Sequence, residues 1–178
     1  MFSRSVILVG MPGSGKSTIG RSVASLCGMD FIDTDELLQK SLCMSLQDYI
    51  DKFGHDAFAK AEDDFLKNME APDVPKVIAT GGSAVLYPDA MRHLKEIGTV
   101  VFIDCDLPLL KKRLWNFESR GIVTAPGEDK EQAMLKLYME REPLYYKYCD
   151  VRIDQGKKGR KLITDQVIEG VKEYEDKL

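Results

Sequence analysis

Short apolar runs alternate with segments of helical period along the chain, and this alternation limits the possible folds more than any other feature. Five runs rich in apolar residues are flanked by turn residues: Ser5–Val9, Asp30–Ile32, Lys76–Ala79, Thr99–Ile103 and Val151–Ile153. Short, continuous apolar runs of this kind predict strands that are buried on both faces. Because helical patterns separate them, the sequence predicts an α/β fold with three layers, α/β/α, around a five-stranded parallel sheet.

The helical patterns fill the intervals between the expected strands. A capping-box pattern at Ser45–Asp48 precedes an apolar face formed by Leu46, Tyr49, Ile50 and Phe53. The other expected helices cover Gly15–Cys27, Pro88–Glu96, a segment starting at Asp106–Pro108, Lys130–Tyr148 and Leu162–Lys177.

Composition and charge narrow the function classes. The chain has 178 residues, 44% of them hydrophobic and 30% charged, which predicts a single globular domain over residues 1–178. The net charge of −4 argues against a nucleic-acid partner, which normally needs a basic surface. The longest apolar run is too short to cross a bilayer, so no membrane partner is expected.

The cysteines do not form a metal-binding or disulfide pattern. Cys27, Cys43, Cys105 and Cys149 are widely spaced, and the chain has only two histidines, so zinc-ligand spacing is absent. We expect reduced cysteines, mostly in the core, and a cytoplasmic location.

The strongest motif is GMPGSGKS, from Gly10 to Ser17, directly after the first expected strand and before a helix. It matches G-x-x-x-x-G-K-[ST], in which glycines let backbone N–H groups turn toward one anion. The lysine supplies a cation for the β- and γ-phosphates, and the hydroxyl of Ser17 a ligand for Mg²⁺. The alternative is a tight strand–helix turn that happens to contain a lysine, and the complete motif in its context favours a triphosphate site.

Two carboxylates follow the second expected strand, in Phe31-Ile32-Asp33-Thr34-Asp35. Asp33 and Asp35 can serve a metal ion and a substrate hydroxyl, as phosphoryl transfer requires. The alternative is that they cap the following helix, where aspartate is favoured.

Adjacent glycines follow the third expected strand, in Thr80-Gly81-Gly82-Ser83. They permit a close backbone approach to a ligand, although a plain turn accounts for them equally well. Residues 118–131 form the longest stretch without clear periodicity, which is typical of a lid over a site.

Taken together, these stretches resemble the shikimate kinase family of small P-loop kinases, which is related to the nucleoside monophosphate kinases. The resemblance extends from Val6 to about Ile153 and includes FIDTD, ATGGSAV and the segment REPLYY that begins at Arg141. It implies a P-loop NTPase fold with a lid loop, a substrate-binding helical segment at about residues 34–70, and a monomer. ATP, Mg²⁺ and a small-molecule acceptor are the implied ligands.

The resemblance assigns roles to individual residues. ATP would be wrapped by Gly13, Ser14, Gly15, Lys16, Ser17 and Thr18. Ser17 would bind Mg²⁺ directly and Asp33 through water. Arg113 would flank the adenine, and the lid residue Arg120 would close on the phosphates. The catalytic residues would then be Lys16, Asp35 and Arg120.

On the acceptor side, the resemblance implies that Asp35 holds the substrate hydroxyls and orients or deprotonates the attacking one. Gly81 and Gly82 would offer backbone contacts, and Arg141 would grip a carboxylate. Each arginine also has a simpler interpretation: Arg113 and Arg120 as surface residues, and Arg141 as the partner of a helix acid.

The chain departs from the family pattern on the acceptor side. Residues 54–62 align with Gly-Glu-x-x-Phe-Arg-x-x-Glu, but Ala59 stands where the family arginine helps to bind the carboxylate, while Glu62 remains. The third family glycine is replaced by Ser83, which places a hydroxyl near the substrate. The sequence therefore predicts ATP-dependent phosphorylation of a small hydroxylated carboxylate, most simply shikimate. Gluconate-like sugar acids, nucleoside monophosphates, or a regulatory nucleotide-binding role are the alternatives.

Overall fold

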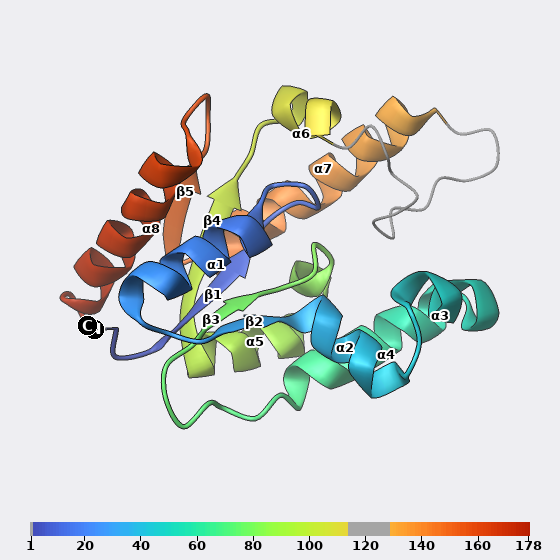
Figure 1. Cartoon of the computed structure of the whole chain (residues 1–178). Helices are drawn as coiled ribbons and strands as arrows, with labels where there is room; N and C mark the ends of the chain where they lie inside the picture. Colours follow the sequence, from blue (N-terminus) through green and yellow to red (C-terminus); the bar gives the residue numbers. More distant parts are fainter. Residues whose placement is uncertain (1, 114–128) are drawn as a thin grey trace.

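The computed structural model describes residues 2–113 and 129–178. Five parallel strands form one sheet in the order β2-β3-β1-β4-β5 (Figure 1). Their bounds are β1 Ser5–Val9, β2 Phe31–Asp33, β3 Val77–Ala79, β4 Gly98–Asp104 and β5 Val151–Asp154. The predicted five-stranded parallel sheet is therefore confirmed, with β2 displaced by one residue toward the C-terminus.

The helices connect the strands, and six of those described lie where the patterns predict them, with small shifts at their ends. Two more, at Thr34–Leu42 and His55–Lys67, were not predicted from a pattern and lie within the helical segment at about residues 34–70 that the resemblance implies. The bounds of the helices are α1 Lys16–Cys27, α2 Thr34–Leu42, α3 Leu46–Phe53, α4 His55–Lys67, α5 Pro88–Ile97, α6 Leu107–Arg113, α7 Lys130–Tyr148 and α8 Arg160–Glu175, with a short 3₁₀ turn at Ala84–Leu86. Ser45 caps α3 as predicted, because its hydroxyl accepts a hydrogen bond from the Asp48 N–H at 3.0 Å.

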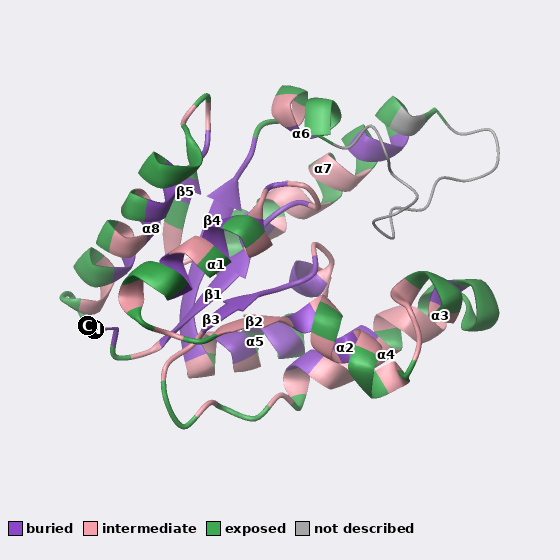
Figure 2. Cartoon of the chain, in the orientation of Figure 1, coloured by how far each residue is buried: buried purple, intermediate pink, exposed green. Residues whose placement is uncertain are grey.

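Helices cover both faces of the sheet, which gives the predicted three layers. Alternate residues of β1 point to opposite faces: Val6 and Leu8 pack with α1 and α8, whereas Ile7 and Val9 pack with α5 and α7. Figure 2 shows β1, β3 and β4 as the buried centre, with exposed residues on the outer sides of the helices. Burial on both faces explains why β1, β3 and β4 are mainly apolar, whereas the edge strands β2 and β5 are only partly buried.

The position of β1 in the middle of the sheet determines where a ligand can bind. From β1 the chain crosses to β2 and β3 on one side, and later to β4 and β5 on the other. Ligands of open parallel sheets bind at such a switch point, outside the carboxyl ends of the strands. The glycine loop follows β1 at this point, and α2, α3 and α4 extend from the β2 edge beside it (Figure 1).

Two expectations about the rest of the molecule have different outcomes. None of the described helices combines the length and apolar character that a bilayer-crossing segment needs. The four cysteines are unpaired, but only Cys105 is buried, and Cys43 is exposed. The expectation that most cysteines lie in the core is therefore wrong, since the helix ends and loops that carry the others are only partly covered.

Candidate active site

The glycine loop between β1 and α1 has the backbone that an anion cradle requires. Gly10, Gly13 and Gly15 have φ angles of 150°, 79° and 91°, which L side chains rarely adopt. At Gly10 a Cβ atom would also lie 2.7 Å from the backbone carbonyl oxygen of Ile103. These glycines are therefore needed for the path of the loop and are not incidental to a turn.

Lys16 begins α1 and folds back over the loop. Its side chain is buried, and Nζ donates hydrogen bonds to the carbonyl oxygens of Gly10 at 2.8 Å and Met11 at 3.0 Å. An ammonium group held at the mouth of a glycine cradle, beside the positive end of a helix dipole, favours a polyanion there.

Ser17 and Asp33 meet across the loop and the end of β2. The Ser17 hydroxyl donates to Asp33 Oδ2 at 2.7 Å, while Asp33 Oδ1 accepts from the Asp35 N–H at 3.1 Å. Asp33 therefore caps α2 and also faces Ser17, so its interpretation as a cap is confirmed, while its role at a metal ion stays a prediction. Hydroxyl and carboxylate oxygens are the hard ligands that Mg²⁺ prefers, with phosphate oxygens and water completing its shell. The residues present fit that ion.

Asp35, in the first turn of α2, faces a second buried acid across Gly81. A Cβ atom on Gly81 would lie 2.8 Å from Asp35 Oδ1 and 2.6 Å from Glu62 Oε1, so only glycine fits between the two carboxylates. Burial, followed by repulsion from Glu62 and Asp33, raises the pKa of Asp35 to about 6, against a smaller lowering by Lys16. A carboxylate with such a pKa is suited to accept a proton near neutral pH.

Glu62, on α4, is held by two hydroxyl groups. The Ser83 hydroxyl lies 2.8 and 2.6 Å from its two oxygens, and Tyr87 Oη donates to Oε2 at 2.8 Å. Burial raises the pKa of Glu62, and these hydrogen bonds and the charge of Arg141 oppose the rise. Ser83 thus contacts Glu62 directly, which sequence reasoning did not predict.

Arg141 and Tyr145 lie one helical turn apart on α7 and border the same region. The Nε atom of Arg141 is buried without a hydrogen-bond partner. Tyr145 is fully buried, and its hydroxyl donates to the Gly82 carbonyl oxygen at 2.6 Å. The second glycine of the pair is further fixed because a Cβ there would lie 2.5 Å from Pro12 Cδ. The glycine pair is therefore locked between the loop and α7.

Arg113, at the end of α6, lies against the outside of the glycine loop. Its Nη1 atom donates to the carbonyl oxygens of Gly13 at 3.3 Å and Ser14 at 3.2 Å, and to Gln155 Oε1 at 2.8 Å. Its role beside adenine stays a prediction. Arg120 lies outside the described residues, as does most of the expected lid; its last residues, Lys130 and Glu131, begin α7.

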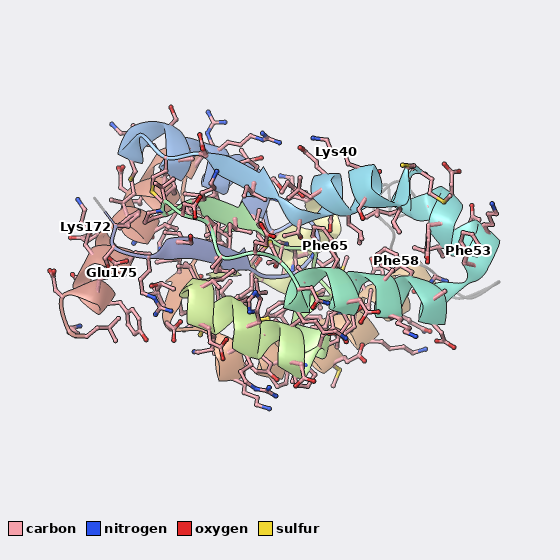
Figure 3. All side chains as sticks on the ribbon, turned by 90° about the horizontal axis from the view of Figure 1, so that it is seen from below. Lys40, Phe53, Phe58, Phe65, Lys172 and Glu175 are labelled. Carbon is pink, nitrogen blue, oxygen red and sulfur yellow. The ribbon has the colours of Figure 1, made fainter. Side chains whose placement is uncertain are left out.

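One cleft of about 660 Å³ brings most of the predicted residues together. It runs from the loop and the two aspartates to Arg141, and is lined also by Gln39 of α2, Ile50 of α3 and Phe58 of α4. Figure 3 shows Phe58 on the part of α4 that lies opposite α2 and α3. The predicted residues that line the cleft are Gly13, Gly15, Lys16, Ser17, Thr18, Asp33, Asp35, Gly81, Gly82, Ser83 and Arg141.

A second hollow of about 680 Å³ lies between α1 and α8 and is more open. It shares Ser17 and Thr18 with the cleft but contains neither carboxylate. Of these two hollows, only the cleft is lined by both the phosphate loop and the two carboxylates. The cleft is therefore the candidate active site.

Three residues of the site were missed as functional candidates. Each of them contacts a residue distant in the chain: Tyr87 contacts Glu62, Tyr145 contacts Gly82, and Gln155 contacts Arg113. No local motif marks such pairs. The one available signal was REPLYY, whose spacing places Tyr145 one turn after Arg141 on the same side of a helix.

The comparisons with known proteins agree with this geometry. The family model described as shikimate kinase matches residues 12–172. A shikimate kinase of Thermodesulfovibrio yellowstonii is 31% identical over 172 residues, covering 97% of this chain and 95% of the relative. One of Paramagnetospirillum magneticum is 32% identical over 174 residues, covering 97% and 87%.

A solved structure, shikimate kinase from Acinetobacter baumannii in complex with shikimate, superposes with a TM-score of 0.85. It is 26% identical, and the match covers 93% of this chain and 91% of that one. The family model and the curated relatives extend over almost the whole sequence, including both ends of the cleft. The chain therefore belongs to the shikimate kinase family.

Proposed function

We propose that the protein transfers the γ-phosphoryl group of ATP to a ring hydroxyl of shikimate, giving shikimate 3-phosphate for aromatic amino acid biosynthesis. The observation that carries the proposal is the single cleft with two distinct ends. One end has the glycine loop and Lys16, which suit a triphosphate, and the other has Arg141, which suits a carboxylate. Asp35 lies between them, where an acceptor hydroxyl must be placed.

Each residue of the site has a proposed role in phosphoryl transfer. Loop N–H groups and Lys16 bind the phosphates and stabilise the charge that develops on the transferring group. Asp35 orients the attacking hydroxyl and accepts its proton, for which its pKa of about 6 is suited. Ser17 and Asp33 would hold Mg²⁺, which neutralises phosphate charge when bound. Arg120 is the proposed lid arginine.

Two departures from the family pattern at the acceptor end, Ala59 and Ser83, affect the expected affinity for shikimate. Ala59 lines the cleft with only a methyl group, and the Ser83 hydroxyl donates its hydrogen bond to Glu62. Arg141 is then the arginine left to grip the carboxylate among the described cleft residues. A charge-assisted hydrogen bond contributes about 1.5–3 kcal/mol. We therefore expect the affinity for shikimate to be lower, by about tenfold or more, than that of a site with two arginines.

The experiment is an acceptor panel with purified protein, ATP and MgCl₂, measuring ADP release and confirming the product by ³¹P NMR. Shikimate should give the highest kcat/KM, ahead of gluconate and AMP. Preference for either of the others would replace the acceptor assignment. Tight ATP binding without turnover of any acceptor would indicate a regulatory module.

The family also bears on the oligomeric state, because the resemblance of the sequence to it implies a monomer. The working form is accordingly proposed to be a cytoplasmic monomer. Sedimentation equilibrium at micromolar concentration tests the oligomeric state.

A further inference from the structure

The carbonyl groups of the glycine loop accept hydrogen bonds from side chains inside and outside the loop. Where loop N–H groups turn inward to an anion, neighbouring carbonyls turn outward, and buried carbonyls need donors. Lys16 supplies donors to the carbonyls of Gly10 and Met11 from within the loop. The carbonyls of Gly13 and Ser14 are bonded instead by side chains that lie outside the loop.

Gln155 is one of these donors and follows β5 directly. Its side chain is buried, with only 1% of the residue exposed. Its Nε2 group donates to the Ser14 carbonyl oxygen, and its Oε1 atom accepts from Arg113 Nη1 at 2.8 Å. Its own backbone N–H donates to the Asp104 carbonyl oxygen at 2.8 Å. Both halves of the amide are thus engaged, and the residue is fixed to the end of β4.

Arg113 completes the arrangement from α6. Its Nη1 atom lies within hydrogen-bond distance of the carbonyl oxygens of Gly13 and Ser14 as well as of Gln155. We call Gln155 and Arg113, with their bonds to these two carbonyls, the loop brace. The brace joins three segments that are far apart in the chain: the loop, the end of α6 and the end of β5.

The geometry of one peptide bond shows what the brace does. In a planar trans peptide the C=O and the following N–H point in opposite directions. The Ser14 carbonyl points to Gln155, so the Gly15 N–H points away from it, and Gly15 lines the cleft. Glycine tolerates the alternative orientation of this peptide as easily, because it has no Cβ to disfavour either. A flipped peptide would present a carbonyl oxygen to the phosphates in place of an N–H.

We propose that Gln155 is a positioning residue for the triphosphate: by holding the Ser14 carbonyl outward, it keeps the Gly15 N–H directed into the cleft. The inference rests on the proposed function, because it assumes that the cleft binds ATP. It goes beyond that function by assigning the control of loop orientation to a residue that does not line the cleft.

Two variants separate the possible effects. Gln155→Leu removes both side-chain hydrogen bonds while keeping a similar volume. Gln155→Glu keeps an acceptor for Arg113 but cannot donate to the Ser14 carbonyl. Gln132→Leu, on the exposed side of α7, is the matched control. Circular dichroism and thermal unfolding establish that each variant is folded.

The measurement is the dissociation constant for MgATP and for AMP by calorimetry, because AMP lacks the β- and γ-phosphates. We expect both Gln155 variants to raise the Kd for MgATP by about tenfold or more. The Kd for AMP should change far less, and Gln132→Leu should match the wild type for both ligands. The Gly15 amide signal in ¹⁵N–¹H spectra should shift on MgADP addition in the wild type and much less in Gln155→Leu.

Three outcomes overturn the inference. Wild-type MgATP affinity in both variants removes the positioning role. Equal losses for MgATP and AMP indicate a general structural role. A loss confined to Gln155→Glu indicates repulsion by the added charge. Absence of MgATP binding by the wild-type protein is a different result, since it contradicts the proposed function itself.

Discussion

The Ser17 hydroxyl donates to Asp33 Oδ2 at 2.7 Å, while the other oxygen of the same carboxylate accepts from the Asp35 N–H and caps α2. Asp33 therefore combines the cap of α2 with its proposed role at Mg²⁺, and substitutions can separate the two. Asparagine retains an oxygen for the cap and loses the negative charge, whereas alanine loses both.

We predict that Asp33→Asn raises the Mg²⁺ concentration needed for half-maximal rate by about 10–100-fold. Substitution of a residue in the outer shell of a metal site commonly weakens metal affinity by that factor. Its free energy of unfolding should stay close to that of the wild type. Asp33→Ala should show the same change in Mg²⁺ dependence and lose about 1 kcal/mol of stability with the cap. Initial rates across a MgCl₂ series and urea unfolding measure the two effects. An unchanged Mg²⁺ dependence in both variants would remove Asp33 from the metal site.

Activity should depend on pH through Asp35. Its pKa is raised to about 6, first by burial and then by Glu62 and Asp33. Because the ionised form accepts the proton, kcat/KM for the acceptor should increase with pH through about 6 and then level off. Asp35→Asn should lower kcat by about 10²–10⁴-fold and abolish this pH step. A residual step of the same midpoint in the variant would assign the titration to another group, with Glu62 the nearest candidate.

The same raised pKa makes Asp35 unfavourable for folding at neutral pH. The folded state binds this proton more tightly than the unfolded chain, whose carboxyl has a pKa of 3.8. Stability from this group is therefore complete below pH 3.8 and is lost as the pH rises through about 6. We predict that Asp35→Asn unfolds with a free energy about 1–3 kcal/mol higher than the wild type at pH 8, and that the difference shrinks toward pH 4. Urea titrations at both pH values measure it, and a variant less stable than the wild type at pH 8 would contradict the assignment.

The sequence predicts the sheet and the glycine loop because both are encoded by neighbours in the chain. The apolar runs define the strands, and the motif from Gly10 to Ser17 carries its own backbone requirements. Ser45 and Asp48 show the same locality, since the capping box depends on four consecutive residues. The boundary of β2 was missed by one residue because Asp33 both ends the strand and caps α2.

The rest of the site depends on long-range packing that sequence patterns do not contain. Gln155 contacts the loop across 141 positions of the chain, and Tyr145 contacts Gly82 across 63. Ser83 could be recognised as a departure from the family pattern, but its contact with Glu62 required the fold that brings α4 beside the glycine pair. Side chains that act through backbone carbonyls, such as Gln155, have no characteristic motif.

Ala59 offers the sharpest test of the acceptor end. It lines the cleft on α4, three residues before Glu62 and on the same side of the helix. We predict that Ala59→Arg lowers the KM for shikimate by several-fold or more, as the gain of a charge-assisted hydrogen bond would, while the KM for ATP stays unchanged. The reason is that a second guanidinium would share the carboxylate with Arg141.

The matched control is Ala57→Arg, which adds the same side chain two residues earlier on α4, about 200° around the helix, at a position that does not line the cleft. It should leave both KM values at the wild-type level. Steady-state kinetics with shikimate and with its methyl ester complete the test, because the ester lacks the negative charge. The gain in Ala59→Arg should be absent with the ester. An equal gain with both acceptors, or none with shikimate, would show that the carboxylate lies away from Ala59.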